Sequence, residues 1–273
     1  MSILEAIIIA IVEGLTEFLP VSSTGHMVIT SSILGIEEDE FTKVFEVAIQ
    51  LGAIMAVVVL YWKKFFNFSR WQFYLKLIIG VLPALVLGYL FTEKIYDLLE
   101  SPTTVAVAML AGGIVLIFID KFFKNPVVKE EEQLSYVKAF MIGCWQVISM
   151  IPGVSRSAAT IIGGMQQKLT RNLAAEFSFY LAVPTMVAAS GYSLFLKDWT
   201  GSGVAKKGYE LITETRGALT SFIIGNVVAF VVALLAIKFF ISFLQAHGFK
   251  VFGIYRIIVG LILLVLIFAG YLN

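Results

Sequence analysis

The sequence predicts an all-α polytopic membrane protein with two inverted-topology repeats, each a re-entrant helix–turn–helix hairpin followed by three transmembrane helices. Three observations predict this fold class. First, 59% of the 273 residues are hydrophobic and only 14% are charged, against about 25% charged residues in soluble domains. Second, two hydroxyl-rich turns interrupt the long apolar segments. Third, the pattern of turns and apolar segments occurs twice. The net charge of +1 indicates no nucleic-acid partner.

Six apolar segments are long enough to cross a bilayer, which takes about 20 helical residues. They are 43–62, 72–92, 104–123, 173–196, 217–242 and 252–272. The shorter apolar segments 26–35 and 157–167 each follow a Pro/Gly/Ser turn. Such a turn leaves backbone polar groups unpaired, which is tolerated at membrane depth only inside protein or beside a wet cavity. We therefore predict that 2–35 and 136–167 are re-entrant hairpins, each leaving the bilayer on the side it entered.

The two halves of the chain resemble each other. An offset of 132 positions separates two pairs of turn residues, Pro20 with Pro152 and Ser23 with Ser155. We therefore divide the single transmembrane domain, 1–273, into repeats of approximately 1–130 and 131–273. Because each repeat crosses the membrane three times, the second starts on the opposite side and the repeats are inverted. Inverted repeats with broken helices place a polar site near the midplane.

The distribution of Lys and Arg predicts the orientation. One side of this topology holds thirteen basic residues and the other holds six, and the richer side is cytoplasmic by the positive-inside rule. Both termini are therefore predicted outside. The cytoplasmic set is Lys63, Lys64, Arg70, Lys76, Lys121, Lys124, Lys129, Lys138, Lys168, Arg171, Lys238, Lys250 and Arg256.

Two carboxylates, Glu13 and Glu17, lie inside the first apolar segment. Ionisable groups at membrane depth are costly, so their first interpretation is functional. A spacing of four places both on one helical face, where two like charges need a cation or several donors between them. Carboxylate oxygens suit Mg²⁺ or Ca²⁺, and we predict that this pair binds one of these divalent cations. The alternative is that one carboxyl group is neutral and hydrogen-bonded within the bundle.

A helix is predicted to begin directly after the first turn, where backbone N–H groups and hydroxyls are free to bind an anion. These donors belong to Ser22, Ser23, Thr24 and Gly25. His26 follows directly and is predicted to be a general acid/base or a nucleophile, against the alternative of a structural histidine. The other histidine, His247, lies in a basic loop and is predicted to be solvated.

The second turn carries Gly153, Ser155, Arg156, Ser157 and Thr160. A guanidinium group is planar, binds phosphate through two parallel hydrogen bonds and stays charged when desolvated. Arg156 is therefore predicted to bind phosphate, with the hydroxyls beside it as further donors. It could instead neutralise one of the two glutamates as a structural ion pair, and the two roles are compatible.

Five further polar residues are weaker candidates. Glu46 and Gln50 share a face of the first full span, where they line the cavity or bond across helices. Gln146 is placed to bond the site from the second hairpin. Asp120 and Glu176 lie near span ends, where an interfacial position is expected.

Both turns match signatures of a known family. The segment Glu13–His26, EGLTEFLPVSSTGH, resembles the glutamate-rich signature of bacterial undecaprenyl-pyrophosphate phosphatases of the bacitracin-resistance type. The segment Pro152–Thr160, PGVSRSAAT, resembles their second signature. The resemblance covers nearly the whole chain in length, repeat pattern and motif order.

The resemblance implies hydrolysis of undecaprenyl diphosphate to the monophosphate and inorganic phosphate in the bacterial plasma (inner) membrane. This reaction recycles the lipid carrier for peptidoglycan and other envelope polymers and confers bacitracin resistance. Carried over, Glu13 and Glu17 would bind the cation or the diphosphate, Ser23 and His26 would supply nucleophile and acid/base, and Arg156 would hold the phosphate. The remaining donors would be Ser22, Ser155, Ser157 and Thr160. Direct attack by water is also compatible with these residues.

A transporter or flippase for a phosphorylated lipid or anion is the alternative function. Inverted repeats with broken helices are typical of transporters, and a carboxylate pair, a histidine and an arginine could form a proton-coupled anion site. The membrane acid-phosphatase superfamily fits less well, because its Ser–Arg element is followed closely by a second histidine and preceded by a Lys…Arg–Pro element, and neither feature occurs here. The predicted partners are the prenyl diphosphate substrate and the bilayer, and a homodimer is left open.

Overall fold

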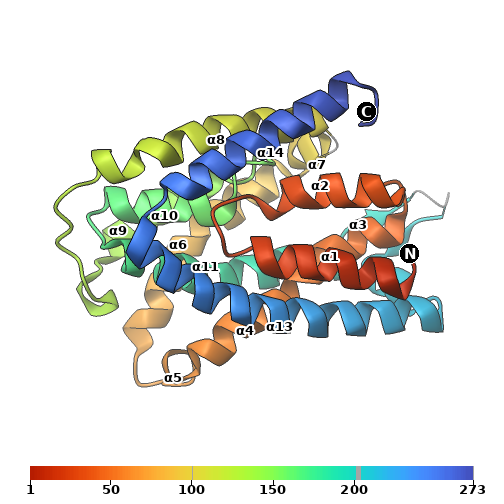
Figure 1. Cartoon of the computed structure of the whole chain (residues 1–273). Coiled ribbons are helices and arrows are strands. Elements are labelled where there is room, and N and C mark those ends of the chain that lie inside the picture. Colours follow the sequence, from red (N-terminus) through yellow and green to blue (C-terminus); the bar gives the residue numbers. More distant parts are fainter. Residues whose placement is uncertain (100, 201–203, 273) are drawn as a thin grey trace.

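The computed structural model describes residues 1–99, 101–200 and 204–272, which are helical almost throughout (Figure 1). The α-helices are α1 (Ile3–Thr16), α2 (Ser23–Leu34), α3 (Glu40–Ala48), α4 (Gln50–Leu60), α5 (Trp62–Phe65), α6 (Trp71–Leu90), α7 (Thr92–Leu99), α8 (Pro102–Phe122), α9 (Tyr136–Ile148), α10 (Arg156–Gln166), α11 (Arg171–Gly191), α12 (Gly208–Thr213), α13 (Arg216–His247) and α14 (Lys250–Phe268). Two short helical turns, Glu131–Gln133 and Tyr192–Leu196, and the strands β1 (Asp198–Trp199) and β2 (Lys206–Lys207) complete the described elements.

Within the described residues, six helical segments are long and apolar enough to cross a membrane. They are Glu40–Leu60, Trp71–Leu90, Pro102–Phe122, Arg171–Leu196, Arg216–His247 and Lys250–Phe268. These are the six predicted spans, shifted at most a few residues at their ends, so the chain is an all-α, multi-pass membrane protein.

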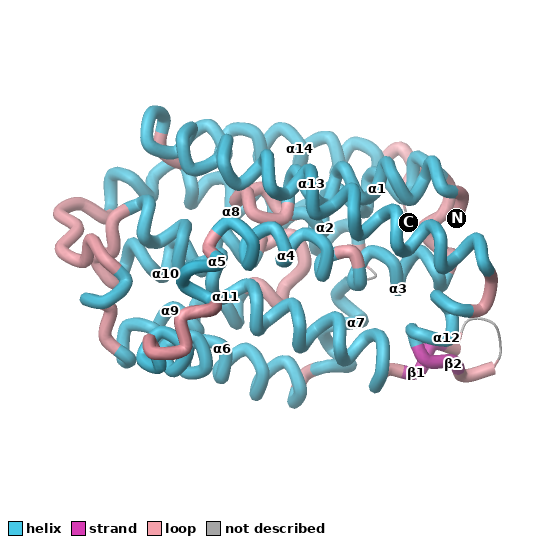
Figure 2. The backbone as a smooth tube through the Cα atoms, turned by 90° about the horizontal axis from the view of Figure 1, so that it is seen from below, coloured by secondary structure: helices cyan, strands magenta, loops and turns pink. Residues whose placement is uncertain are grey.

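The two shorter hairpins, α1–α2 and α9–α10, turn back inside the bundle. Figure 1 shows α1 and α2 side by side and antiparallel, joined by a turn in the interior of the molecule. Both chain termini lie at one end of the bundle, in Figure 1 and in the perpendicular view of Figure 2. The chain therefore forms two helix–turn–helix hairpins at the predicted places, with turns that cover residues 17–22 and 149–155.

A serine with an unusual backbone conformation caps the helix that follows each turn. Ser22 caps α2 with φ 72°, and Ser155 caps α10 with φ 75°; each side chain accepts a hydrogen bond from the third backbone N–H beyond it. A positive φ is rare for a residue with a side chain. The structural counterpart of Ser155 is therefore Ser22, because the second turn is one residue longer than the first.

Small residues bring the hairpins close to the spans. A Cβ atom on Gly14 of α1 would lie 2.9 Å from the carbonyl oxygen of Ala229 in α13, and Gly143 of α9 contacts the backbone of Gly80 in α6. Helix α1 thus packs on α13, and α9 packs on α6. Between helices in a membrane, association depends on such close backbone approach.

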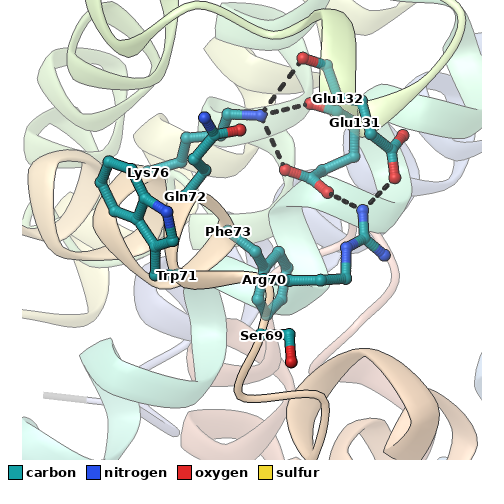
Figure 3. A pocket seen from close by; sticks show the side chains of 8 residues that line it. All are labelled: Ser69, Arg70, Trp71, Gln72, Phe73, Lys76, Glu131 and Glu132. Carbon is teal, nitrogen blue, oxygen red and sulfur yellow. Dashed lines mark hydrogen bonds and ion pairs between the residues drawn. The ribbon is translucent and has the colours of Figure 1, made fainter.

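A cluster of charges, with Lys76 and Glu131 buried and Arg70 and Glu132 nearer the surface, joins the loop before α9 to α6 (Figure 3). The Lys76 ammonium donates to a carboxylate oxygen of Glu131 at 2.9 Å and to its backbone carbonyl at 2.7 Å. Arg70 pairs with Glu131 at 2.9 Å and also with Glu132. A pocket of about 320 Å³ opens beside these residues. Because the charges neutralise one another, we interpret the cluster as a structural tie.

Candidate active site

The two hairpins meet through an ion pair. Nη2 of Arg156, the first residue of α10, lies 2.9 Å from Oε1 of Glu17, the residue that ends α1. The two residues are 139 positions apart in the chain, and both side chains are largely buried. Each turn contributes one member of the pair, so the pair requires both hairpins.

Glu17 also accepts a hydrogen bond from the first residue of α2. Oγ of Ser23 lies 2.5 Å from Oε2 of Glu17. The carboxylate thus has one oxygen on a serine hydroxyl and the other on a guanidinium group. A carboxylate in this position can accept the proton of Ser23, while Arg156 stabilises its negative charge beforehand.

Glu13 lies one helical turn before Glu17 and is fully buried. Neither of its carboxylate oxygens has a hydrogen-bond partner among the described residues. An unpaired carboxylate in this environment needs a proton or a cation. No group of three or more Asp, Glu, His or Cys residues that could hold a metal occurs in the described part of the chain. Mg²⁺, however, usually takes only one or two carboxylates together with phosphate oxygens and waters, so the predicted pair fits such an ion.

Arg156 is held from its other side by α11. Its Nη1 atom donates to the backbone carbonyl of Ser178 at 2.9 Å and contacts the Ser178 hydroxyl at 3.3 Å. Thr160 donates to the same hydroxyl at 2.6 Å. The guanidinium also lies over the ring of Phe18, 5.8 Å from its centre, and its buried Nε has no partner among the described residues. Ser178 is thus a positioning residue that the sequence did not single out.

The other predicted phosphate donors are bonded inside the protein. The hydroxyl of Ser22 accepts from the N–H of Gly25 at 3.4 Å, and the hydroxyl of Ser155 accepts from the N–H of Ala158 at 3.2 Å. Ser157 donates to the carbonyl of Leu19 at 2.8 Å, which ties the second turn to the first. These three side chains hold the helix starts and turns in place.

Glycine is required at two positions around the turns. A Cβ on Gly25 would collide with the sulfur of Met109 on α8. Gly153 has φ +89°, and a Cβ there would collide with the backbone of Val105. Both glycines therefore permit close packing of the turns on α8. Thr24 is half-buried on the first turn of α2.

His26 lies one helical turn after the cap of α2. Its Nδ1 is 2.7 Å from the carbonyl of Ser22, and its Nε2 is 2.7 Å from the hydroxyl of Tyr255 on α14. A carbonyl only accepts, so Nδ1 carries the proton and the neutral ring accepts from Tyr255 at Nε2. The two rings are stacked, 5.5 Å apart. The sequence predicted His26 beside the turn but missed Tyr255 as its partner.

Arg256 is the third residue of the site that the sequence missed, after Ser178 and Tyr255. Its fully buried guanidinium donates to five backbone carbonyls, those of Pro20, Ala108, Met109, Gly153 and Val154. Its inclusion in the cytoplasmic basic set was wrong, because the side chain is not solvated at a membrane surface but binds both turns. Twelve residues remain in that set. An arginine within the apolar last span was the signal that should have identified it.

The weaker candidates lie outside this network. Gln146 bonds Thr185 of α11 at 3.1 Å instead of the turns. Glu176 accepts from Tyr180, and Asp120 ties Arg171 to the backbone N–H of Phe249, as expected of structural residues near span ends. His247 is exposed and Gln50 is half-buried. Glu46 is a half-buried residue whose Oε1 is enclosed and has no partner among the described residues.

Comparisons with known proteins place the chain in one family. The family model "Bacitracin resistance protein BacA" matches residues 6–262. A protein of Flavobacterium psychrophilum named undecaprenyl-diphosphatase is 55% identical over 272 residues, which cover 98% of this chain and 97% of the relative. Relatives with the same name from Porphyromonas gingivalis (strain W83) and Bdellovibrio bacteriovorus are 48% and 46% identical, each over 99% of this chain and 98% of the relative. The chain belongs to the bacitracin resistance protein BacA family.

Proposed function

We propose that this protein hydrolyses undecaprenyl diphosphate to undecaprenyl phosphate and inorganic phosphate, and so recycles the lipid carrier and confers resistance to bacitracin. The observation that carries the proposal is the position of Glu17, which bonds Ser23 on one oxygen and Arg156 on the other. Phosphoryl transfer depends on positioning the reactants and neutralising charge on the phosphoryl oxygens. The curated relatives are named undecaprenyl-diphosphatase, which supports the same reaction.

The residues favour Ser23 as the nucleophile. Glu17 accepts the proton of Ser23 as Oγ attacks the terminal phosphorus, the bond to the bridging oxygen breaks, and undecaprenyl phosphate leaves. Arg156 offers N–H donors to the phosphoryl oxygens, and the N-terminus of α2 adds backbone donors. Water then attacks the phosphoserine and gives its proton to another carboxylate or to His26. Protonated Glu17 returns its proton to Oγ of Ser23 as the bond from this oxygen to phosphorus breaks, and inorganic phosphate is released. Attack by His26, or by water directly, is the competing route.

Glu13 and Glu17 would hold a divalent cation, Mg²⁺ or Ca²⁺. When bound, it would neutralise charge on the diphosphate oxygens. The unpartnered oxygens of Glu13 support this proposal, because a buried carboxylate without a partner is stable only with a bound cation or a proton.

We also propose that the two halves of the chain are inverted repeats and that the chain has a defined orientation in the membrane. Reciprocal packing supports the repeats: α1 of the first half packs on α13 of the second, and α9 of the second packs on α6 of the first. The matching caps Ser22 and Ser155 support them too. With twelve basic residues on the cytoplasmic side, both termini would lie outside in the bacterial plasma membrane. The homodimer stays a prediction.

Product analysis distinguishes the hydrolase from a transporter. The purified protein in detergent, with no second compartment, should convert undecaprenyl diphosphate into equal amounts of undecaprenyl phosphate and inorganic phosphate. Intact substrate after incubation with folded protein and either cation would exclude the hydrolase and direct attention to transport across liposome membranes.

A further inference from the structure

An apolar cavity of about 590 Å³ lies between α8 and the second hairpin. One wall is α8 from Ser101 to Val115, and the opposite wall is the end of α9, the turn and the start of α10. At a rise of 1.5 Å per residue, this stretch of α8 is about 21 Å long. Figure 1 shows α8 running along the bundle beside α10. The cavity is therefore an elongated groove within the apolar part of the molecule.

Small side chains hollow this groove. Ala108, Ala111 and Gly112 on α8 and Ala158 and Ala159 on α10 all line the cavity, and their short side chains leave space between the two helices. Gly112 cannot become larger, because a Cβ there would collide with the guanidinium of Arg256. Arg256, which binds both turns, therefore also restricts the size of the residue at position 112 in the groove wall.

Three of the polar side chains at the margins of the groove, Ser101, Thr104 and Trp145, are hydrogen-bonded within the protein, and Thr103 is a further polar residue at the Ser101 end. Nε1 of Trp145 donates to Gln166 at 2.6 Å, and Thr104 donates to the hydroxyl of Ser101 at 2.9 Å. The remaining lining is aliphatic, with Ile148, Ile151 and Ile162 among its residues. A ligand in this groove would meet hydrocarbon along its length.

The groove begins beside the candidate active site. Val154 lines it, and the carbonyl of this residue accepts from Arg256 at 2.8 Å. Ala158 also lines it, and its N–H donates to Ser155 at 3.2 Å. These two groove residues flank Arg156 in the sequence, so the groove lies along the turn that carries the arginine that would hold phosphate.

We propose that this groove binds the part of the substrate's prenyl chain nearest the diphosphate. The inference rests on the proposed function, which supplies a ligand with a polar end at Arg156 and a branched hydrocarbon attached to it. The cavity volume falls in the range of small-molecule sites, roughly 300–1,000 Å³. It holds only part of a 55-carbon chain, and the remainder lies in the bilayer.

The groove acts by packing and not by removing the chain from water. Lipid tails are as apolar as the groove walls, so its contribution is shape and van der Waals contact. A chain fixed in the groove aligns the attached diphosphate with Ser23 and Arg156, and such alignment speeds the chemical step. Selectivity for a prenyl chain over a tailless diphosphate follows from this arrangement.

A substitution that fills the groove tests the proposal. Ala111→Trp should lower kcat/KM for undecaprenyl diphosphate by about tenfold, because it removes many chain contacts, and should leave kcat/KM for dimethylallyl diphosphate, with its single isoprene unit, unchanged. Ala189→Trp is the matched control, since Ala189 is exposed on α11 outside the groove, and it should change neither. An equal loss with both substrates, or no loss with the long one, would overturn the groove assignment.

Photolabelling gives a second readout that needs no turnover. A prenyl diphosphate carrying a benzophenone on its third isoprene unit should label peptides from 101–115 or 145–162 of the wild-type protein, and unlabelled undecaprenyl diphosphate should compete. Labelling confined to other helices would overturn the proposal. If the function itself is wrong, the wild-type protein will release no phosphate from any of these diphosphates, which is a different outcome.

Discussion

Nη2 of Arg256 lies 2.7 Å from the carbonyl oxygen of Gly153. Nη1 of the same guanidinium lies 2.8 Å from the carbonyl of Val154 and 3.4 Å from that of Pro20 in the other hairpin. Turns at membrane depth leave carbonyls without helical partners, and each would be costly if unpaired. One side chain thus satisfies both turns and fixes their relative position.

Replacing Arg256 should misplace the catalytic groups without removing any of them. Arg256→Lys keeps the charge but lacks the planar fork that reaches both turns. We expect kcat to fall about a hundredfold, as for small displacements of reacting groups, with a smaller change in KM. Arg256→Met should lose as much activity and also unfold at a lower temperature in detergent.

Arg216→Met is the control for these variants, because Arg216 is an exposed residue at the start of α13. It should keep the activity and melting temperature of the wild type. Full activity in Arg256→Lys would show that the bridge between the turns has no positioning role.

Ser23 should carry a phosphoryl group during turnover. Acid quenching after incubation with terminally ³²P-labelled substrate should trap phosphoserine, and Ser23→Ala should abolish this label and lower kcat at least about a thousandfold. Ser32→Ala, later on α2, serves as the control. A parallel base quench detects phosphohistidine, which survives base but not acid, and a label found only there would assign the attack to His26. Turnover without any trapped label in a rapid-quench series would favour direct attack by water.

Glu13 should determine the requirement for a divalent cation. Chelation should abolish activity, and added Mg²⁺ or Ca²⁺ should restore it. Glu13→Gln should raise the cation concentration for half-maximal activity at least about tenfold. The cation should also raise the melting temperature of the wild type, since it binds the folded state, and should fail to do so in Glu13→Gln. Glu5→Gln, at the start of the same helix, is the control. Full activity in chelator would contradict the metal assignment.

The Lys76–Glu131 pair should contribute to stability and not to chemistry. Removing Glu131 leaves the Lys76 ammonium buried without a charged partner, at a cost of about 3–5 kcal/mol, whereas removing Lys76 leaves Glu131 paired with Arg70. Glu131→Leu should therefore lower the unfolding temperature markedly and Lys76→Met should lower it less, while the double variant should recover most of the loss of Glu131→Leu. Specific activity of the folded fraction should stay near the wild-type value. A double variant that is less stable than either single variant would show that the pair is not the source of the effect.

Acid should weaken the same cluster through Glu132. A hydrogen bond from its own backbone N–H, and the neighbouring Arg70 guanidinium, lower the pKa of this carboxyl group. The stabilisation is present in full above the ordinary carboxyl pKa, about 4.3, and is lost as pH falls through the lowered value. Melting temperature measured against pH in wild type and Glu132→Gln should therefore converge at the acid end. Parallel curves would contradict this linkage.

Much of the site could be predicted because charge is rare inside apolar sequence. Glu13, Glu17 and Arg156 stood out for that reason, and the hydroxyl-rich turns located their neighbours. The six spans followed from length and hydropathy, which depend on local sequence alone. The hairpins followed from segments too short to cross the bilayer.

The remainder depended on contacts between residues far apart in the chain. Arg256 lies near the start of its apolar segment, where an arginine resembles an ordinary cytoplasmic anchor, and its carbonyl partners come from three other parts of the chain. Tyr255 reaches His26 across 229 positions, and no local pattern indicates such a partner. The correspondence of Ser22 with Ser155 was missed because the second turn is one residue longer than the first. The offset between these two caps is therefore one residue larger than the offset of 132 between Pro20 and Pro152.

The central claim is that Glu17 from one hairpin and Arg156 from the other act as one unit, and a double-mutant cycle on phosphate release tests it most directly. Glu17→Gln and Arg156→Lys should each lower kcat for undecaprenyl diphosphate about a thousandfold. The double variant should be no worse than the poorer single variant, because residues that act together are strongly non-additive. Losses that multiply in the double variant, or near wild-type turnover in either single variant, would contradict the account.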